Sequence, residues 1–347
     1  MNPLRTLPMA LAASFPRMLY GLLGLMAFAH QSSAEISRGY LLVANKGDQN
    51  LSVVDPVSGM VLTNVFEAGV TGHEVAASLD GQRAFVPIYG NSGVGGKGTD
   101  GTLLQVIDLK KGLVSGRVDF GKGVRPHCAV MEPKNGLLYV TTELDNSVAV
   151  INPDTLEILG NIPTGQAESH MLAITRNGER GYTANVGPGT VSVLDLKAKK
   201  LVTIISVSPK IQRISLSIDD RCVFTADQTR PRLAVIDTAT NGVCSWIELP
   251  STGYGTAATP DGRWLLVALN KVNQVGLIDL KSRTLQRTWE VPKSPQEILV
   301  QPDGAFAYVS CDASRQVEVI DLSTWKICKE IHTGPGTDGL AWANRPE

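Results

Sequence analysis

Short segments in which apolar and polar residues alternate recur along the whole chain at nearly constant spacing. Each copy ends in an acid or an amide, and the seven copies are LSVVD at 51–55, LQVID at 104–108, VAVIN at 148–152, VSVLD at 191–195, LAVID at 233–237, VGLID at 275–279 and VEVID at 317–321. Their last residues are separated by 53, 44, 43, 42, 42 and 42 positions. A constant period of about 42 residues indicates a protein built from structural repeats, one of which carries an insertion.

One repeat shows how each copy divides into four short strands. Branched, aromatic and other apolar residues dominate segments 170–175, 182–185, 191–194 and 201–207, and the dipeptide Asn177-Gly178 separates the first two. Such residues favour strands, whereas Asn-Gly favours a tight turn. The repeats contain no ten-residue stretch with a helical period. The pattern predicts an all-β protein, a seven-bladed β-propeller with four-stranded antiparallel blades.

The two ends of the repeat region predict how the ring of blades closes. Residues 40–45 (YLLVAN) have the pattern of a second strand, and residues 338–343 (DGLAWA) have the pattern of a first strand. Pairing these two segments completes one blade and leaves no open edge between the ends of the chain. We therefore expect one propeller domain over residues 35–347.

The N-terminal segment predicts export. Arg5 and Arg17 precede a 12-residue apolar run at 18–29 (MLYGLLGLMAFA), and small residues precede a predicted cleavage site after Ala34. A run of this length is typical of a signal peptide and short for a membrane span. We predict a signal peptide over residues 1–34 and a periplasmic protein with no membrane span after cleavage. An uncleaved membrane anchor is the alternative.

Composition narrows the classes of partner. Lys plus Arg number 32 and Asp plus Glu number 33, and aromatic residues make up 5% of the chain. Because neither an excess of cations nor a set of stacking aromatics is present, we expect no nucleic-acid partner. We expect a monomer that binds a small molecule or a periplasmic protein. The five cysteines show no metal-binding spacing, and we expect free thiols on strands.

Four segments carry a resemblance to a known family: LLVANKGDQNLSVVD, LYVTTELDNSVAVIN, GYTANVGPGTVSVLD and AYVSCDASRQVEVID. They resemble the YVTN-type propeller repeat, and the resemblance covers about residues 39–343. It implies a seven-bladed propeller of the exported bacterial type. Relatives include sugar-lactone hydrolases and subunits of quinone-dependent dehydrogenases. Lactone hydrolysis and a non-catalytic binding or scaffold role beside an envelope redox system are therefore alternative functions.

The same resemblance places the first strand of each blade innermost, with its start at one mouth of the central channel. Aligning the first strands by their following turns gives one residue per blade, and these seven ring positions are His73, His127, His170, Gln212, Tyr254, Gln296 and Asp338. We expect them to form a polar ring at the mouth of the channel.

Three adjacent ring positions are histidines, and the fourth neighbour is an aspartate. Converging imidazoles with one open position are typical of Zn, Cu or Fe sites. We predict a divalent transition metal held by His73, His127, His170 and Asp338, in a metal-binding protein or a metal-dependent enzyme. Glu168 or backbone carbonyls would hold the remaining imidazole nitrogens. Two alternatives are a polar binding site without metal and a structural ring copied by duplication.

Further residues are candidates for contact with a ligand. We expect Arg125, Gln212, Tyr254 and Gln296 to contact a bound small molecule or cofactor. The insertion, residues 89–102 (YGNSGVGGKGTDGT), lies between the second and third strands of its blade, on the side of the ring. It predicts either a flexible lid over the histidines or a solvated loop.

Overall fold

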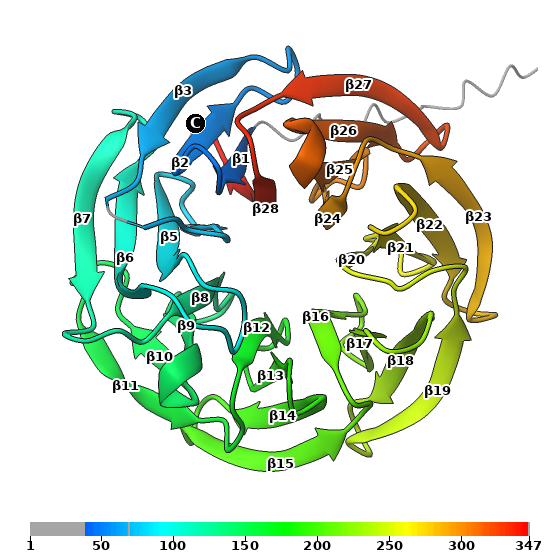
Figure 1. Ribbon diagram of the computed structural model, residues 1–347, viewed down its shortest axis with the longest axis horizontal. Helices are drawn as coiled ribbons and strands as arrows, with labels where there is room; N and C mark the ends of the chain where they lie inside the picture. The colour runs from blue at the N-terminus through cyan, green and yellow to red at the C-terminus, as the bar shows by residue number, and fades with distance from the viewer. Residues whose placement is uncertain (1–38, 69, 346–347) are drawn as a thin grey trace, which may run out of the picture. The chain divides into compact units, whose positions relative to one another are not determined.

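Seven four-stranded antiparallel sheets surround a central channel in the computed structural model, which describes residues 39–68 and 70–345. Figure 1 shows the sheets arranged radially, with the first strands innermost and the fourth strands on the rim. The predicted all-β propeller with seven blades is confirmed. The predicted signal peptide lies outside the described residues. Among the residues described, no helix is long and apolar enough to span a membrane.

The blades follow one another along the chain. Blade 1 contains β28 (Thr337–Asn344), β1 (Gly39–Asn45), β2 (Asn50–Val54) and β3 (Val61–Phe66). Blades 2 and 3 contain β4 (Ala76–Ala77), β5 (Arg83–Gly90), β6 (Asp100–Asp108), β7 (Leu113–Asp119), then β8 (Pro126–Met131), β9 (Leu138–Thr142), the 3-10 turn η1 (Glu143–Asp145), β10 (Ser147–Ile151) and β11 (Ile158–Pro163). Blades 4 and 5 contain β12 (Ser169–Ile174), β13 (Arg180–Asn185), β14 (Thr190–Asp195), β15 (Lys200–Ser206), then β16 (Ile211–Leu216), β17 (Cys222–Asp227), β18 (Arg232–Asp237) and β19 (Gly242–Glu248). Blades 6 and 7 contain β20 (Thr256–Ala258), β21 (Trp264–Leu269), β22 (Gln274–Asp279), β23 (Thr284–Glu290), then β24 (Pro295–Val300), β25 (Phe306–Cys311), the 3-10 turn η2 (Asp312–Ser314), β26 (Gln316–Asp321) and β27 (Lys326–His332).

The ends of the chain close the ring as the sequence predicts. β1 pairs antiparallel with β28, with Leu42 opposite Ala341 and Gly39 opposite Asn344. Blade 1 is therefore assembled from both ends of the described chain. This pairing supplies β28, without which β1 would present a free inner edge.

The core lies between neighbouring blades. Leu42 of blade 1 and Val86 and Ile107 of blade 2 are fully buried in one cluster that spans the two sheets. The middle strands are buried on both faces, and every residue of β2 and β10 is inaccessible or nearly so. Burying each such aliphatic side chain contributes roughly 1.5–3 kcal/mol, so blade-to-blade packing dominates the stability of the ring.

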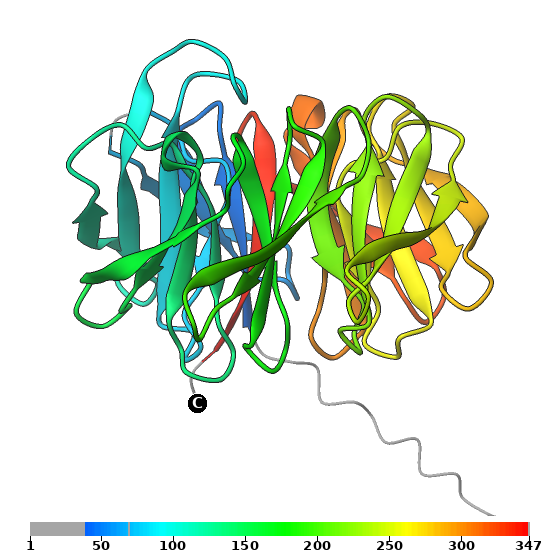
Figure 2. The same cartoon turned by 90° about the horizontal axis from the view of Figure 1, so that it is seen from below.

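The insertion lengthens the second and third strands of blade 2 and projects beyond them. Gly90 of β5 still pairs with Asp100 of β6, and the residues between them form a loop at one end of the propeller. Figure 2 shows this cyan segment rising above the neighbouring blade connections. Gly101 is needed at its base, because a Cβ there would lie 1.6 Å from the Ile88 carbonyl oxygen. The predicted position of the insertion is confirmed.

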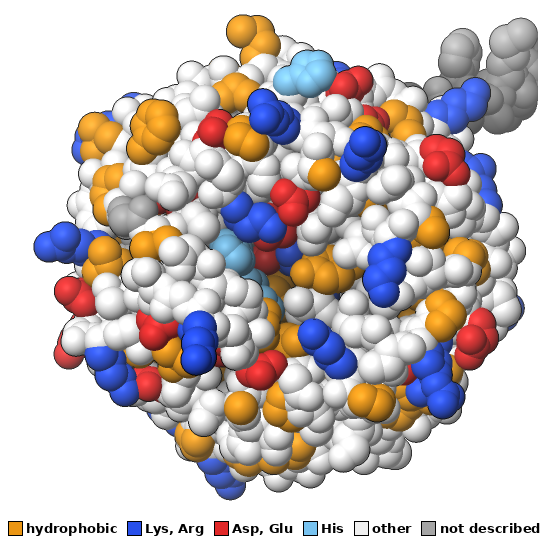
Figure 3. All heavy atoms as spheres, viewed as in Figure 1, with side chains coloured by type: hydrophobic (Ala, Val, Ile, Leu, Met, Phe, Trp, Pro, Cys, Tyr) orange, Lys and Arg blue, Asp and Glu red, His pale blue; other side chains and the backbone are white. Residues whose placement is uncertain are grey.

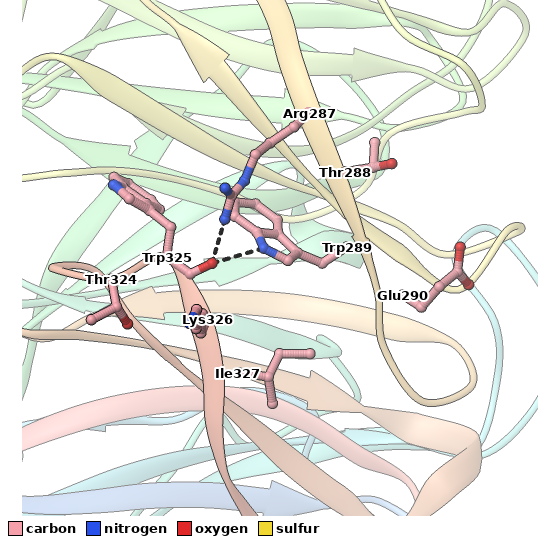
Figure 4. Close-up of a pocket in the computed structure, with 8 residues that line it drawn as sticks. All are labelled: Arg287, Thr288, Trp289, Glu290, Thr324, Trp325, Lys326 and Ile327. Carbon is pink, nitrogen blue, oxygen red and sulfur yellow. Dashed lines mark hydrogen bonds between the residues drawn. The ribbon is translucent and has the colours of Figure 1, made fainter.

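A groove of about 620 Å³ on the rim lies between β23 and β27 (Figure 4). Its contacts join two blades. The indole Nε1 of Trp289 donates to the Trp325 carbonyl at 2.9 Å, and the Arg287 guanidinium donates to the same oxygen. Arg287 also lies 4.1 Å above the Trp289 ring. These contacts of Arg287 and Trp289 with the Trp325 carbonyl join blades 6 and 7.

Candidate functional site

A polar cavity of about 140 Å³ lies at the mouth of the channel, on the side of the insertion. Figure 3 shows histidine side chains inside the central hollow. The cavity is lined by Lys46, His73, Tyr89, Ser92, Gly93, Val94, His127, His170, Gln212, Arg213, Tyr254 and Asp338. Six of the seven predicted ring positions thus lie around one cavity. Gln296 does not line it and instead donates to Ser294 Oγ at 3.0 Å.

Irregular strand starts turn the ring residues toward the channel. The register of β12 against β13 shifts between Ser169 and Met171, so His170 lies at a bulge. The register of β8 against β9 shifts in the same way between Pro126 and Ala129, so His127 also lies at a bulge. A bulge adds one residue to a strand and redirects a side chain. Two residues before these histidines, Arg125 and Glu168 adopt left-handed φ values of 50° and 55°, which turn the chain into the channel.

The three imidazoles form one packed group. The rings of His127 and His170 stack with their centres 3.4 Å apart and their planes at 27°. His73 lies edge-on to His127, with ring centres 5.5 Å apart. The ring of Tyr89, which is fully buried, packs against all three at 4.9–5.6 Å. Tyr89 is the first residue of the insertion, so alignment of the first strands alone did not reveal it.

Two of the imidazoles are oriented through their Nδ1 atoms. Nδ1 of His127 lies 3.2 Å from the His170 carbonyl oxygen, and Nδ1 of His170 lies 3.2 Å from Glu143 Oε2. The same carboxylate oxygen accepts a hydrogen bond from the Tyr89 hydroxyl, with the two oxygens 2.6 Å apart. A backbone carbonyl therefore serves one ring, as predicted. Glu168 serves neither, because its carboxylate accepts the Gly187 N–H at 2.6 Å.

The histidines are neutral at pH 7. Burial lowers the pKa of His73 to about 4, despite the opposing charge of Asp338. Burial also lowers the pKa of His127 far below its usual range, and the neighbouring His170 lowers it further. For His170, burial again outweighs Glu143, and the pKa is lowered. The stacking of His127 and His170 agrees with neutral rings, because two adjacent imidazolium ions would repel each other.

The predicted metal ligands lie close together without forming a coordination sphere. Two imidazoles bound to one zinc ion would have ring centres about 5 Å apart, given tetrahedral geometry and Zn–N bonds of about 2 Å. The stacked pair at 3.4 Å is too close for this. Across the described residues, no group of three His, Cys, Asp or Glu could hold a metal ion as arranged. Asp338 instead forms ion pairs with Lys46 and Arg213.

The wall opposite the histidines is built around a buried guanidinium. Arg213 lies 2.8 Å from Glu74, 3.1 Å from Glu297 and 2.7 Å from Asp338. Asp338 also lies 3.0 Å from Lys46 Nζ. We call these five residues the ion cluster.

The pKa values of Glu74 and Asp338, two carboxyl groups of the ion cluster, are shifted in opposite directions. Burial raises the pKa of Glu74 well above its usual range, and the nearby charges of Glu297 and Asp338 add to this effect. Burial opposes ionisation of Asp338 too, but Lys46 and Arg213 outweigh it and lower the pKa of that carboxyl. Glu74 therefore ionises less readily than Asp338 within the same cluster.

The sequence did not point to Arg213, although it directly follows a ring residue. Simple strand alternation would direct it away from the ring. Its φ of 57° and the register shift between Gln212 and Ser215 turn it inward. The sequence signal that could have identified Arg213 is a charged residue directly after the ring residue Gln212.

The remaining predicted contacts divide into two groups. Gln212 and Tyr254 line the cavity, and Gln212 Nε2 donates to the Tyr254 hydroxyl at 3.2 Å. Arg125 does not line it. Its guanidinium donates to Asp100 at 2.7 Å and to the Gly96 carbonyl at 2.7 Å, and therefore holds the insertion in place.

The insertion covers the histidines as a lid. Ser92, Gly93 and Val94 line the cavity, and the Gly95 N–H donates to Glu143 Oε1 at 3.2 Å. Ser92 is 5% exposed, and its hydroxyl has no hydrogen-bond partner among the residues described. The lid is thus tied to the carboxylate that orients His170.

No protein-family model and no curated protein matches the chain. Solved structures do match. Hydrazine synthase from Kuenenia stuttgartiensis is 18% identical with a TM-score of 0.70, over 81% of this chain and 92% of that one. The dihydro-heme d1 dehydrogenase NirN, solved in complex with DHE, is 12% identical with a TM-score of 0.63, over 87% of this chain and 74% of that one. These likenesses confirm the β-propeller fold. At such identities they show the fold alone.

Proposed function

We propose that this protein binds a small polar molecule in the cavity between the three histidines, the ion cluster and the lid. The buried hydroxyl of Ser92 carries the proposal. Ser92 lines the cavity, and its hydroxyl has no partner in the described part of the chain, although Gly95 and Gly96 of the same loop are both hydrogen-bonded. An unsatisfied buried hydroxyl costs about 1–3 kcal/mol, which a bound molecule would recover.

The size of the cavity limits the ligand. A protein cavity of about 150 Å³ accepts benzene, so about 140 Å³ accommodates roughly six non-hydrogen atoms. Sites for drug-sized ligands enclose about 300–1,000 Å³. The heme d1 named for NirN is too large for this cavity.

Filling the cavity from the lid tests this proposal. Val94→Trp would place an indole in the cavity, whereas Val272→Trp makes the same change in the corresponding connection of blade 6. Saturation-transfer NMR with glycerol, ethanolamine, glycolate and acetamide should detect binding to the wild type and to Val272→Trp. Val94→Trp should bind none of them. Equal signals from both variants would contradict the proposal.

A divalent metal is the second candidate. Ligating histidines usually donate their other ring N–H to a carboxylate or a carbonyl, and His170 and His127 have such partners. The stacked rings would have to separate for both to bind one ion. Protein without a histidine tag should be loaded with Zn²⁺, Cu²⁺ or Fe²⁺ and dialysed. A metal content below about 0.2 per chain, unchanged when all three histidines are replaced, would contradict a metal site.

Location and the family relationship complete the proposal. The apolar run at 18–29 supports export to the periplasm, where the binding would take place. The repeat segments support kinship with YVTN-type propellers. Lactone hydrolysis and a scaffold role beside a redox system rest on that resemblance, and no contact among the described residues favours them.

A further inference from the structure

We infer that the ligand of this cavity is a hydrogen-bond donor, a small protic molecule that gives N–H or O–H groups to the Nε2 atoms of His127 and His170. This inference rests on the proposed binding function. It follows from which atoms of the two rings already have partners, and from what those partners can accept.

The tautomer of His127 follows from its partner. Its Nδ1 faces the His170 carbonyl oxygen, which can only accept a hydrogen bond. Nδ1 must therefore carry the proton. A neutral imidazole has one N–H, so Nε2 of His127 carries a lone pair.

The same reasoning applies to His170. Its Nδ1 faces Glu143 Oε2, and the Glu143 carboxylate accepts hydrogen bonds from Tyr89 and Gly95. Burial opposes its ionisation, but the contacts with His170, Tyr89 and Gly95 outweigh burial and lower its pKa. An ionised carboxylate only accepts, so Nδ1 of His170 is the donor and Nε2 carries a lone pair.

We call His73, His127 and His170 the histidine wall of the cavity. The Nε2 lone pairs of His127 and His170 need hydrogen-bond donors. In the described part of the chain, the hydrogen bonds of both rings are made through Nδ1, and both rings line the cavity. Protonating Nε2 is disfavoured, because burial keeps both rings neutral. A shared metal ion does not fit rings stacked at 3.4 Å. An N–H or O–H donor needs no such separation of the rings.

The side of the cavity formed by Gln212 and Tyr254 requires a hydrogen-bond acceptor on the ligand. The Tyr254 hydroxyl accepts from Gln212, so its own proton is available to an acceptor. Ser92 can serve as donor or acceptor. A small molecule with donors at one end and a carbonyl or hydroxyl oxygen at the other matches both walls. A primary amide carries both kinds of group, N–H donors and a carbonyl oxygen, which point in different directions from one carbon.

Acetamide and acetone provide a matched pair of probes for the wild-type protein. They have nearly the same shape and the same carbonyl group, and only acetamide has N–H donors. Imidazole ¹⁵N NMR should show His127 and His170 as the Nδ1–H tautomers. Acetamide should shift their Nε2 resonances with an affinity in about the millimolar range, and acetone should bind at least about tenfold more weakly. Exposed His332 is the internal control, and its resonances should not move.

The outcomes of these experiments separate the inference from the proposed binding function. Ser92→Ala should weaken acetamide binding while leaving the tautomers unchanged. Nε2–H tautomers, or acetone binding as well as acetamide, would overturn the inference while leaving a binding site in place. Zn²⁺ bound by His127 and His170 together would overturn it in favour of a metal. If neither probe nor the other small molecules bind, the proposed function fails and this inference fails with it.

Discussion

The histidine wall and the ion cluster face each other across one cavity, yet they bury polar groups in opposite ways. The histidine wall keeps its rings neutral and orients them through a carbonyl and a carboxylate. The ion cluster keeps its charges and surrounds one guanidinium with carboxylates from other blades. A buried charge needs partners at several angles, whereas a neutral imidazole has one donor and one acceptor nitrogen to satisfy. The comparison explains why removing residues from the two walls should have unequal effects.

Arg213 should have the largest effect. Arg213→Met leaves Asp338 and Glu297 without their shared cation, so we expect a loss of about 3–5 kcal/mol in the free energy of unfolding. Urea denaturation measures it. Arg221→Ala is the control, since that side chain is 84% exposed and should change stability by less than about 0.5 kcal/mol. Equal effects of the two substitutions would show that the buried Arg213 stabilises the fold no more than an exposed arginine does.

Acidification should act through the histidine wall. The pKa of His73 falls from 6.5 when unfolded to about 4 when folded, so the unfolded chain binds more protons between these pH values. The resulting stability is complete above pH 6.5 and is lost as the pH falls toward 4, up to about 3 kcal/mol. Urea midpoints of the wild type and His73→Gln should converge over this window. Their difference separates His73 from Glu74, whose raised pKa changes stability in the opposite direction. A constant difference would contradict neutral burial of His73.

The contacts of the lid should have an intermediate effect. Arg125→Ala removes its bonds to Asp100, Glu143 and the Gly96 carbonyl. We expect a loss of about 2 kcal/mol, because Glu143 is left buried with fewer partners. Hydrogen exchange at the Gly95 amide should accelerate by about tenfold or more. Unchanged exchange there would show that Arg125 does not hold the lid.

Ser92 should have the smallest effect on folding and a clear effect on binding. Ser92→Ala removes a buried hydroxyl that has no partner in the described part of the chain, so stability should change by less than about 1 kcal/mol and can increase. Binding of acetamide should weaken. A large loss of stability without loss of binding would assign Ser92 to the structure of the lid.

The repeat pattern was sufficient to predict the blades and their closure by the chain ends, because these features depend on period and alternation, which are visible along the sequence. The prediction that the ring lies at the mouth of the channel came from the resemblance to YVTN-type repeats. Tyr89 and Arg213 were missed because they reach the cavity from an insertion and from a left-handed residue, and Glu143 was missed because it contacts His170 from a 3-10 turn. Such placements depend on local irregularity and on contacts between blades.

Ring position alone did not reveal how the side chains pair. His127 and His170 occupy equivalent positions, and equivalence suggested convergence on one ion. Their stacking depends on the orientation that the His170 carbonyl and Glu143 impose on each ring. The partner of His170 lies in the preceding blade, and no periodic pattern identifies it.

The pairing of β1 with β28 also links the site to the order of synthesis. Lys46 lies just after the first described strand, whereas Asp338 belongs to the last one, and these residues meet only when the ring closes. A nascent chain that has not reached residue 338 therefore has Arg213 and Lys46 without the aspartate that joins them. Contacts so distant in sequence form late and slowly. We expect the cavity to be completed in the last step of folding, so that ligand binding would report a closed ring of blades.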